Sequence, residues 1–93
     1  MASSKETAAF VLDQLGPLGR TKRMFGEFGI YMDGTFVGLI CDDEVYLKPT
    51  AATAGFEVGT PYPNAKPHPK VPAEILEDAE EFRRLALETA ALL

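Results

Sequence analysis

The chain has 93 residues, of which 46% are hydrophobic and 25% are charged, and its formal net charge is −5. This size and balance predict one globular domain with a thin stability margin. The negative charge works against nonspecific binding to nucleic acid, because such binding needs many Lys and Arg contacts to phosphates. No apolar run reaches the roughly 20 residues of a membrane span, and the N-terminus does not resemble a signal peptide. We therefore expect a cytoplasmic protein that does not bind membranes.

Residues 3–15 are predicted to form the first helix. Ser3 and Glu6 have the spacing of a capping box, and Gly16 followed by Pro17 is typical of a helix end. The apolar stripe at helical spacing consists of Ala8, Val11, Leu12 and Leu15, with Phe10 expected at its edge.

Arg20, Lys22 and Arg23 lie in the stretch that leads into a predicted sheet. Residues two apart in a strand share a face, so Arg20 and Lys22 should point together and Arg23 away from them. The commoner explanation of such charges is a solvated strand that resists edge-to-edge pairing. Contact with a ligand or with nucleic acid is the alternative.

The sequence Met24-Phe25-Gly26-Glu27-Phe28-Gly29 has two glycines three residues apart in an aromatic run. This pattern indicates a bulge or a tight bend, and we interpret it as a bent strand. A phosphate-binding loop is disfavoured, because neither a Gly-Lys-Ser/Thr sequence nor a helix start follows.

Asp33-Gly34 predicts a two-residue hairpin turn, since both positions tolerate positive φ. The return strand spans residues 35–41, and an acidic turn at residues 42–44 precedes a strand at residues 45–48. Three consecutive acids lack the ligand spacing of a calcium loop. Strict alternation predicts Phe36, Gly38 and Ile40 on one face of the return strand and Val37, Leu39 and Cys41 on the other.

Thr50 is expected to cap a short helical turn that Gly55 ends. Residues 62–70 contain three prolines, which lack an amide donor, so they predict an irregular loop or an edge strand. Within this segment Lys66, His68 and Lys70 alternate and predict a modest basic strip.

Residues 72–93 are predicted to be helical, with Pro72 at the first helical position. A break near Glu77 is expected, after which Asp78 caps a longer helix. The stripe that should face the sheet consists of Ile75, Ala79, Phe82, Ala86, Ala90 and Leu93. The water side should consist of Glu80, Glu81, Arg83, Arg84 and Glu88, with Glu80 and Arg84 as an ion pair.

Cys41 and His68 are the single representatives of their residue types. One cysteine excludes an intramolecular disulfide and a multi-cysteine zinc site. Cys41 lies in an apolar run, where a thiol is usually buried and inert, and His68 has no partnered nucleophile. We expect no enzymatic activity, no metal and no cofactor.

The stretch RMFGEFGIYMDGTFVGLICDDEVYLK resembles the signature of the TfoX N-terminal domain, found in the TfoX/Sxy regulators of natural competence. Residues 71–72 and 76–78 resemble the family's run into its last helix, so the resemblance spans nearly the whole chain. Glu27, Phe28 and residues 66–70 depart from the family pattern. The matching positions in the central stretch are Arg23, Met24, Phe25, Gly26, Gly29, Ile30, Tyr31, Asp33, Gly34, Tyr46, Leu47 and Lys48.

The resemblance implies an α+β two-layer sandwich, in which an antiparallel sheet of about five strands is covered on one face by N- and C-terminal helices, similar to type III secretion chaperones. Strand signals grouped between two terminal helices lead to the same fold class. We expect a single-domain member without the C-terminal helical domain of the two-domain regulators. The implied function is regulatory, alongside a transcription factor in competence gene expression.

The leading hypothesis is a non-enzymatic regulatory or interaction module with a protein partner. Its predicted binding surface combines basic and aromatic residues on adjacent strands and consists of Arg20, Lys22, Arg23, Tyr31, Tyr46 and Lys48. Direct nucleic-acid binding through the same patch is one alternative. A small-ligand site or a minor enzyme with a reactive Cys41 or His68 is another. The small core and an exposed sheet edge also predict a homodimer.

Overall fold

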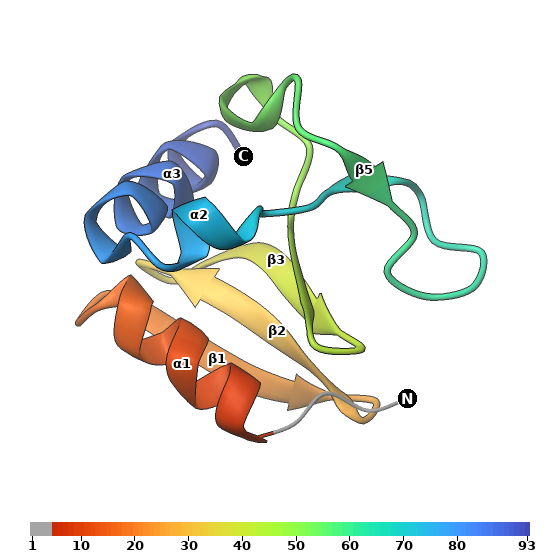
Figure 1. Cartoon of the computed structure of the whole chain (residues 1–93), viewed down its shortest axis with the longest axis horizontal. Coiled ribbons are helices and arrows are strands. Elements are labelled where there is room, and N and C mark those ends of the chain that lie inside the picture. Colours follow the sequence, from red (N-terminus) through yellow and green to blue (C-terminus); the bar gives the residue numbers. More distant parts are fainter. Residues whose placement is uncertain (1–4) are drawn as a thin grey trace.

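The structure, a computed structural model, describes residues 5–93, so the capping box expected from Ser3 lies outside the described residues. The element order is helix, four strands, a short 3-10 helix, two short strands and two helices (Figure 1). The bounds are α1 (Lys5–Leu15), β1 (Gly19–Met24), β2 (Glu27–Met32), β3 (Thr35–Cys41), β4 (Glu44–Leu47), η1 (Ala51–Thr53), β5 (Val58–Gly59), β6 (His68–Pro69), α2 (Ala73–Leu76) and α3 (Ala79–Ala91).

The first four strands form an antiparallel sheet in which each strand pairs with the next one in the sequence. They are joined by two-residue turns at Phe25-Gly26, Asp33-Gly34 and Asp42-Asp43, and both residues of each turn have positive φ. Type I′ turns require positive φ at both positions, and they match the right-handed twist of the strands. The turns predicted at Asp33-Gly34 and at the acidic residues are confirmed. The bent strand predicted over residues 24–29 is wrong, because the chain reverses at Phe25-Gly26.

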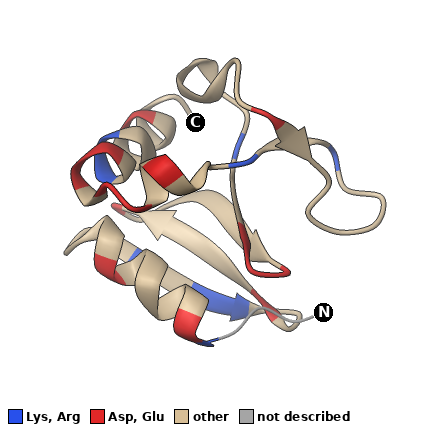
Figure 2. Ribbon diagram, in the orientation of Figure 1, with Lys and Arg blue, Asp and Glu red and all other residues tan. Residues whose placement is uncertain are grey.

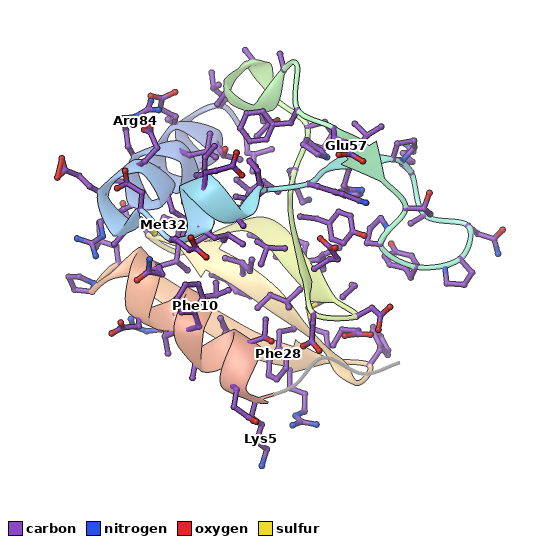
Figure 3. All side chains as sticks on the ribbon, viewed as in Figure 1. Lys5, Phe10, Phe28, Met32, Glu57 and Arg84 are labelled. Carbon is purple, nitrogen blue, oxygen red and sulfur yellow. The ribbon has the colours of Figure 1, made fainter. Side chains whose placement is uncertain are left out.

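Helices α1 and α3 pack on one face of this sheet, which confirms the predicted α+β two-layer sandwich (Figure 1). Buried apolar side chains from both layers fill the space between them, and Figure 3 shows Phe28 and Met32 among them. The largest fully buried side chains are Phe82, Leu15, Ile30, Met32, Ile40, Leu47, Val11, Val37 and Thr89.

Two residues assigned to the apolar stripes are exposed. Leu12 is 39% exposed, because it lies at the margin of a stripe centred on Ala8, Val11 and Leu15. Leu93 is 55% exposed, because α3 ends at Ala91 and the chain no longer follows the helical stripe there.

A register shift between β2 and β3 exchanges the predicted faces of Phe36 and Val37, while the faces predicted for residues 38–41 are confirmed. Ile30 pairs with Gly38 and Tyr31 pairs with Phe36, which leaves Val37 without an opposing residue. Such an extra residue interrupts the alternation of side chains along a strand. Val37 is therefore buried in the core, whereas Phe36 lies on the opposite face, beside Tyr31.

The region between the sheet and the last helices follows the prediction closely. Thr50 caps η1, with its side chain and that of Thr53 forming a reciprocal capping box. Strand β6 ends the proline-rich loop and pairs with β5, and an antiparallel bridge between Tyr46 and Lys70 attaches it to β4. Helix α2 begins one residue after Pro72, which is its N-cap.

The polar side of α3 differs from the predicted one in two respects. Arg84 forms ion pairs with Glu81 and Glu88 rather than with Glu80. Arg83 is half-buried and donates hydrogen bonds to main-chain carbonyls at the end of α1. The break before α3 is confirmed, because Asp78 accepts a hydrogen bond from the Glu81 amide as its N-cap.

Candidate functional site on the uncovered face of the sheet

The face of the sheet opposite the helices carries basic and aromatic side chains on neighbouring strands. Arg20 on β1 pairs with Tyr31 on β2, and Tyr31 in turn pairs with Phe36 on β3. The rings of Tyr31 and Phe36 have centroids 5.2 Å apart with a tilt of 40°, a favourable geometry for two aromatic side chains. Lys22 lies two residues along β1 from Arg20, on the same face. We call Arg20, Lys22, Tyr31 and Phe36 the outer patch.

Glycine at position 29 allows this aromatic cluster to form. A Cβ atom there would lie 2.6 Å from the Met24 sulfur and 3.0 Å from a ring carbon of Phe36. The side chains of Met24, Tyr31 and Phe36 therefore close over the backbone of Gly29. Of the glycines in the predicted motif, Gly26 and Gly34 serve as turn residues with positive φ, while Gly29 provides space.

The six residues predicted to bind a partner do not all share one surface. Arg20, Lys22, Tyr31 and Lys48 lie on the uncovered face, and the ammonium group of Lys48 is 4.7 Å from the centroid of the Phe36 ring. Arg23 points to the other face, as its alternation predicted, where its guanidinium carbon is 5.5 Å from the centroid of the Phe28 ring.

Tyr46, the sixth predicted binding residue, is only 6% exposed. Its ring lies beneath the short β5–β6 ladder, since a Cβ atom on Gly59 would be 3.4 Å from a carbon of that ring. Burial, aided by the nearby carboxylate of Glu44, raises the pKa of its phenol above the ordinary value. Tyr46 is therefore a packing residue and not part of an exposed stacking surface.

Beside the outer patch lies a groove of about 550 Å³, within the range of small-molecule and peptide sites. Phe36, Leu39 and Cys41 of β3 line it, since the bulge at Val37 turns Phe36 toward the same side as Leu39. The remaining lining residues come from the first hairpin, the end of β4 and the proline-rich loop, and include Met24, Phe25, Glu27, Lys48, Tyr62 and His68.

The two ends of the groove differ in charge. Lys48 and His68 lie at one end, and the Nδ1 atom of His68 is 2.7 Å from the main-chain oxygen of Lys66. Because a carbonyl oxygen only accepts, Nδ1 carries the proton in this contact. Glu27 lies at the other end, where its carboxylate accepts a hydrogen bond from the amide of Asp42.

Cys41 lines the groove but is only 3% exposed. Burial raises the pKa of its thiol, and the charge of Glu27 raises it further. A raised pKa keeps the thiol protonated at neutral pH, and the thiolate is the nucleophilic form. These features disfavour a reactive Cys41.

A second hollow of about 620 Å³ lies between the start of β4 and α2. It is more open than the groove, and its charged lining residues are of both signs, namely Asp43, Glu44, Glu57 and Lys70. Within residues 5–93, no three His, Cys, Asp or Glu side chains gather in a group that could hold a metal ion. In the same part of the chain no helix is both long enough and apolar enough to cross a membrane.

Sequence reasoning missed most of the groove. Phe36 and Leu39 were assigned to opposite faces, because the bulge at Val37 has no recognisable signal in an apolar run. Phe25 was not recognised as a turn residue, because phenylalanine rarely adopts positive φ. The predicted basic strip of Lys66, His68 and Lys70 pointed to the proline-rich loop, and of these three residues His68 lines the groove.

Figure 2 shows the charge distribution behind this arrangement. Basic residues lie on β1, and acidic residues are frequent on the helices and at the tip of the β3–β4 hairpin. The uncovered face thus carries local positive charge on a chain whose formal net charge is −5.

Two comparisons with known proteins found sequences similar to this chain. The family model described as the TfoX N-terminal domain matches residues 11–92. An uncharacterized 12.7 kDa protein in the trpE 5′ region of Spirochaeta aurantia is 44% identical over 99 residues, an alignment that covers all of this chain and 85% of that protein.

Proposed function

This chain belongs to the TfoX N-terminal domain family, and on that premise we propose that it is a regulatory module that binds a protein partner and catalyses no reaction. One observation carries the proposal. The face of the sheet opposite the helices, which β5 and β6 cover at Tyr46, joins the outer patch to an apolar groove, while the other face is occupied by the helices. A surface that combines aromatic and Arg anchors with a hollow is typical of protein-binding hot spots.

Two exposed aromatic residues at the groove strengthen this proposal. Phe25 is fully exposed at the tip of the first hairpin, and Tyr62 is 53% exposed in the proline-rich loop. Exposed apolar surface beside a groove marks interaction sites more often than isolated surface residues do. The side chains of Phe25 and Tyr62 supply contact area that a partner would bury.

The charge of the outer patch favours an acidic partner segment. Arg20 and Lys22 lie side by side on β1, and neither forms an ion pair with a carboxylate in residues 5–93. Both side chains are exposed. We propose that an acidic segment of the partner lies across β1 and that the partner takes part in transcription, as for the competence regulators that this family includes.

Adjacent residues on β1 provide a matched test. Lys22 belongs to the outer patch, whereas Arg23 points to the opposite face of the sheet. The two charge reversals therefore make the same kind of change on opposite faces. The Lys22→Glu variant should no longer capture the proteins that the wild-type chain captures from cytosol, whereas Arg23→Glu should still capture them. Calorimetry with the purified partner should likewise show weaker binding by Lys22→Glu than by Arg23→Glu. Equal binding by both variants, with circular dichroism unchanged, would exclude the outer patch as the binding surface.

Nucleic-acid binding is the second candidate, and the aromatic pair on a basic sheet face favours it. Sheet faces with exposed aromatic rings stack on the bases of single strands, and Tyr31 and Phe36 are adjacent to Arg20 and Lys48. This mode predicts an affinity for a single-stranded oligonucleotide that falls steeply with salt, because bound counterions are released. Absence of a mobility shift at low salt excludes it.

A further inference from the structure

The groove has an unpaired cation beside an apolar floor. The ammonium group of Lys48 makes a cation–π contact with Phe36, and no carboxylate in residues 5–93 lies within ion-pairing distance of it. The floor beside it is formed by Phe36 and Leu39. A half-buried ammonium group with no counter-ion favours an anionic group of a ligand.

The register of β4 and β6 places a second polar group at the same end. Tyr46 and Lys70 form an antiparallel bridge. Lys48 lies two residues after Tyr46, and His68 lies two residues before Lys70. Antiparallel pairing thus places His68 next to Lys48, and both line the groove. Since Nδ1 of His68 donates to the carbonyl of Lys66, Nε2 is the atom left for a ligand, and it donates to a carboxylate when the ring is doubly protonated.

The opposite end of the groove differs in both charge and shape. The carboxylate of Glu27 engages the amide of Asp42 there, and Met24 and Phe25 form the adjoining wall. Phe25 has φ of +50° and a fully exposed ring. Backbone strain in a bulky residue whose side chain packs on nothing is frequent at ligand clamps.

From this arrangement we propose that the groove binds a small apolar carboxylate, such as an aromatic acid. Its carboxylate lies between Lys48 and His68, and its apolar body lies along Phe36 and Leu39 toward Met24. The volume of about 550 Å³ accommodates a two-ring compound with room to spare. Such a site makes the module responsive to a metabolite, whatever partner the outer patch binds.

The proposal is tested with 2-naphthoate and its neutral analogue 2-naphthamide, titrated into the isotopically labelled chain. Amide shifts caused by naphthoate should cluster at the groove, in β3 and the proline-rich loop, and naphthamide should bind at least about tenfold more weakly. Lys48→Met retains the apolar stem but removes the charge. It should therefore weaken the binding of naphthoate about tenfold and leave the affinity for naphthamide unchanged. Lys5→Met, which removes an exposed lysine on α1, is the matched control and should change neither affinity.

A further variant tests the groove without altering its charge. Leu39→Trp should fill the floor and reduce binding of both compounds, while Leu87→Trp, at an exposed position on α3, should not. The proposal is overturned if the two compounds bind equally, if Lys48→Met has no more effect than Lys5→Met, or if shifts appear outside the groove. No binding of naphthoate at its solubility limit overturns it as well.

Discussion

The guanidinium group of Arg83 on α3 donates from Nε to the main-chain oxygen of Leu15 at 3.0 Å, and from Nη2 to that of Gln14 at 3.2 Å. Leu15 is the last residue of α1, whose final carbonyls have no partners within the helix. α1 has no basic residue in its last turn, so the cation that complements its C-terminus comes from a helix far away in the sequence.

Removing this contact should destabilise the fold. Arg83→Met retains much of the apolar stem but leaves two carbonyl groups unsatisfied, so the free energy of unfolding should fall by roughly 1–3 kcal/mol. Chemical denaturation followed by circular dichroism measures the change. The neighbouring Arg84→Met is the control, because Arg84 makes only exposed ion pairs with Glu81 and Glu88, which contribute little. An equal loss in both variants would contradict the capping role of Arg83.

Substitution by alanine should destabilise the protein more at Gly38 than at Gly34. A Cβ atom on Gly38 would lie 2.1 Å from the main-chain oxygen of Tyr46 and 3.0 Å from the Cα of Leu47. These are backbone atoms of β4 that cannot move without breaking the sheet. A Cβ atom on Gly34 would meet nothing within 4 Å, although its φ is +82°.

Gly38→Ala should therefore cost about 3 kcal/mol or more of unfolding free energy, the upper end for overpacking. Gly34→Ala should cost roughly 1–2 kcal/mol, the strain of an L-residue at positive φ. Denaturant midpoints of the two variants measure the difference. A smaller effect at Gly38 than at Gly34 would show that β3 and β4 separate more easily than their close approach indicates.

Replacing the exposed Phe25 by a polar residue should stabilise the protein. Phe25 has φ of +50° and is fully exposed, so its side chain contributes no burial that could offset the strain. Asparagine adopts this conformation more readily and is favoured at the first position of such turns. Phe25→Asn should raise the unfolding free energy by about 0.5–1 kcal/mol and should also weaken binding at the groove. Lower stability in the variant would show that the ring makes stabilising contacts in the free chain, contrary to its full exposure.

The sequence predicts those parts of the fold that depend on local chemistry. Asp33-Gly34 and Thr50 use residues whose side chains favour a turn and a cap, and both predictions are confirmed. The hairpin at Phe25 was not predicted, because its turn conformation is imposed by pairing between β1 and β2 rather than by the residue. The bulge at Val37 likewise results from the pairing of two strands and leaves no mark in the sequence.

The candidate site divides in the same way. The basic residues Arg20 and Lys22 were predicted to share a face, because strand alternation is a local property, and they do. The groove depends on contacts between β3 and the proline-rich loop, which are distant in the sequence. Arg83 shows the same limit, since its exposed position in a helical pattern does not reveal a contact with α1.

The thiol of Cys41 should make stability depend on pH in the alkaline range. Burial and the charge of Glu27 raise its folded-state pKa above the ordinary value of 9.0. The folded state then holds the proton more tightly than the unfolded state. The resulting stability is fully present below about pH 9 and is lost as the pH rises through the folded-state pKa. The phenol of Tyr46 adds a similar loss of stability, which begins about one pH unit higher because the ordinary pKa of a tyrosine is 10.0.

Urea unfolding measured at several pH values between about 8 and 10 separates the contribution of the Cys41 thiol from that of the Tyr46 phenol. The wild-type unfolding free energy should decline across this range, and Cys41→Ala should show a shallower decline. Tyr46→Phe should retain the wild-type slope below about pH 9, where the phenol of an unfolded chain is still almost wholly protonated. In parallel, a disulfide reagent should label the native chain far more slowly than the unfolded chain, because the thiol is 3% exposed. Parallel slopes for the wild type and Cys41→Ala, or rapid native labelling, would contradict a buried protonated thiol at the groove.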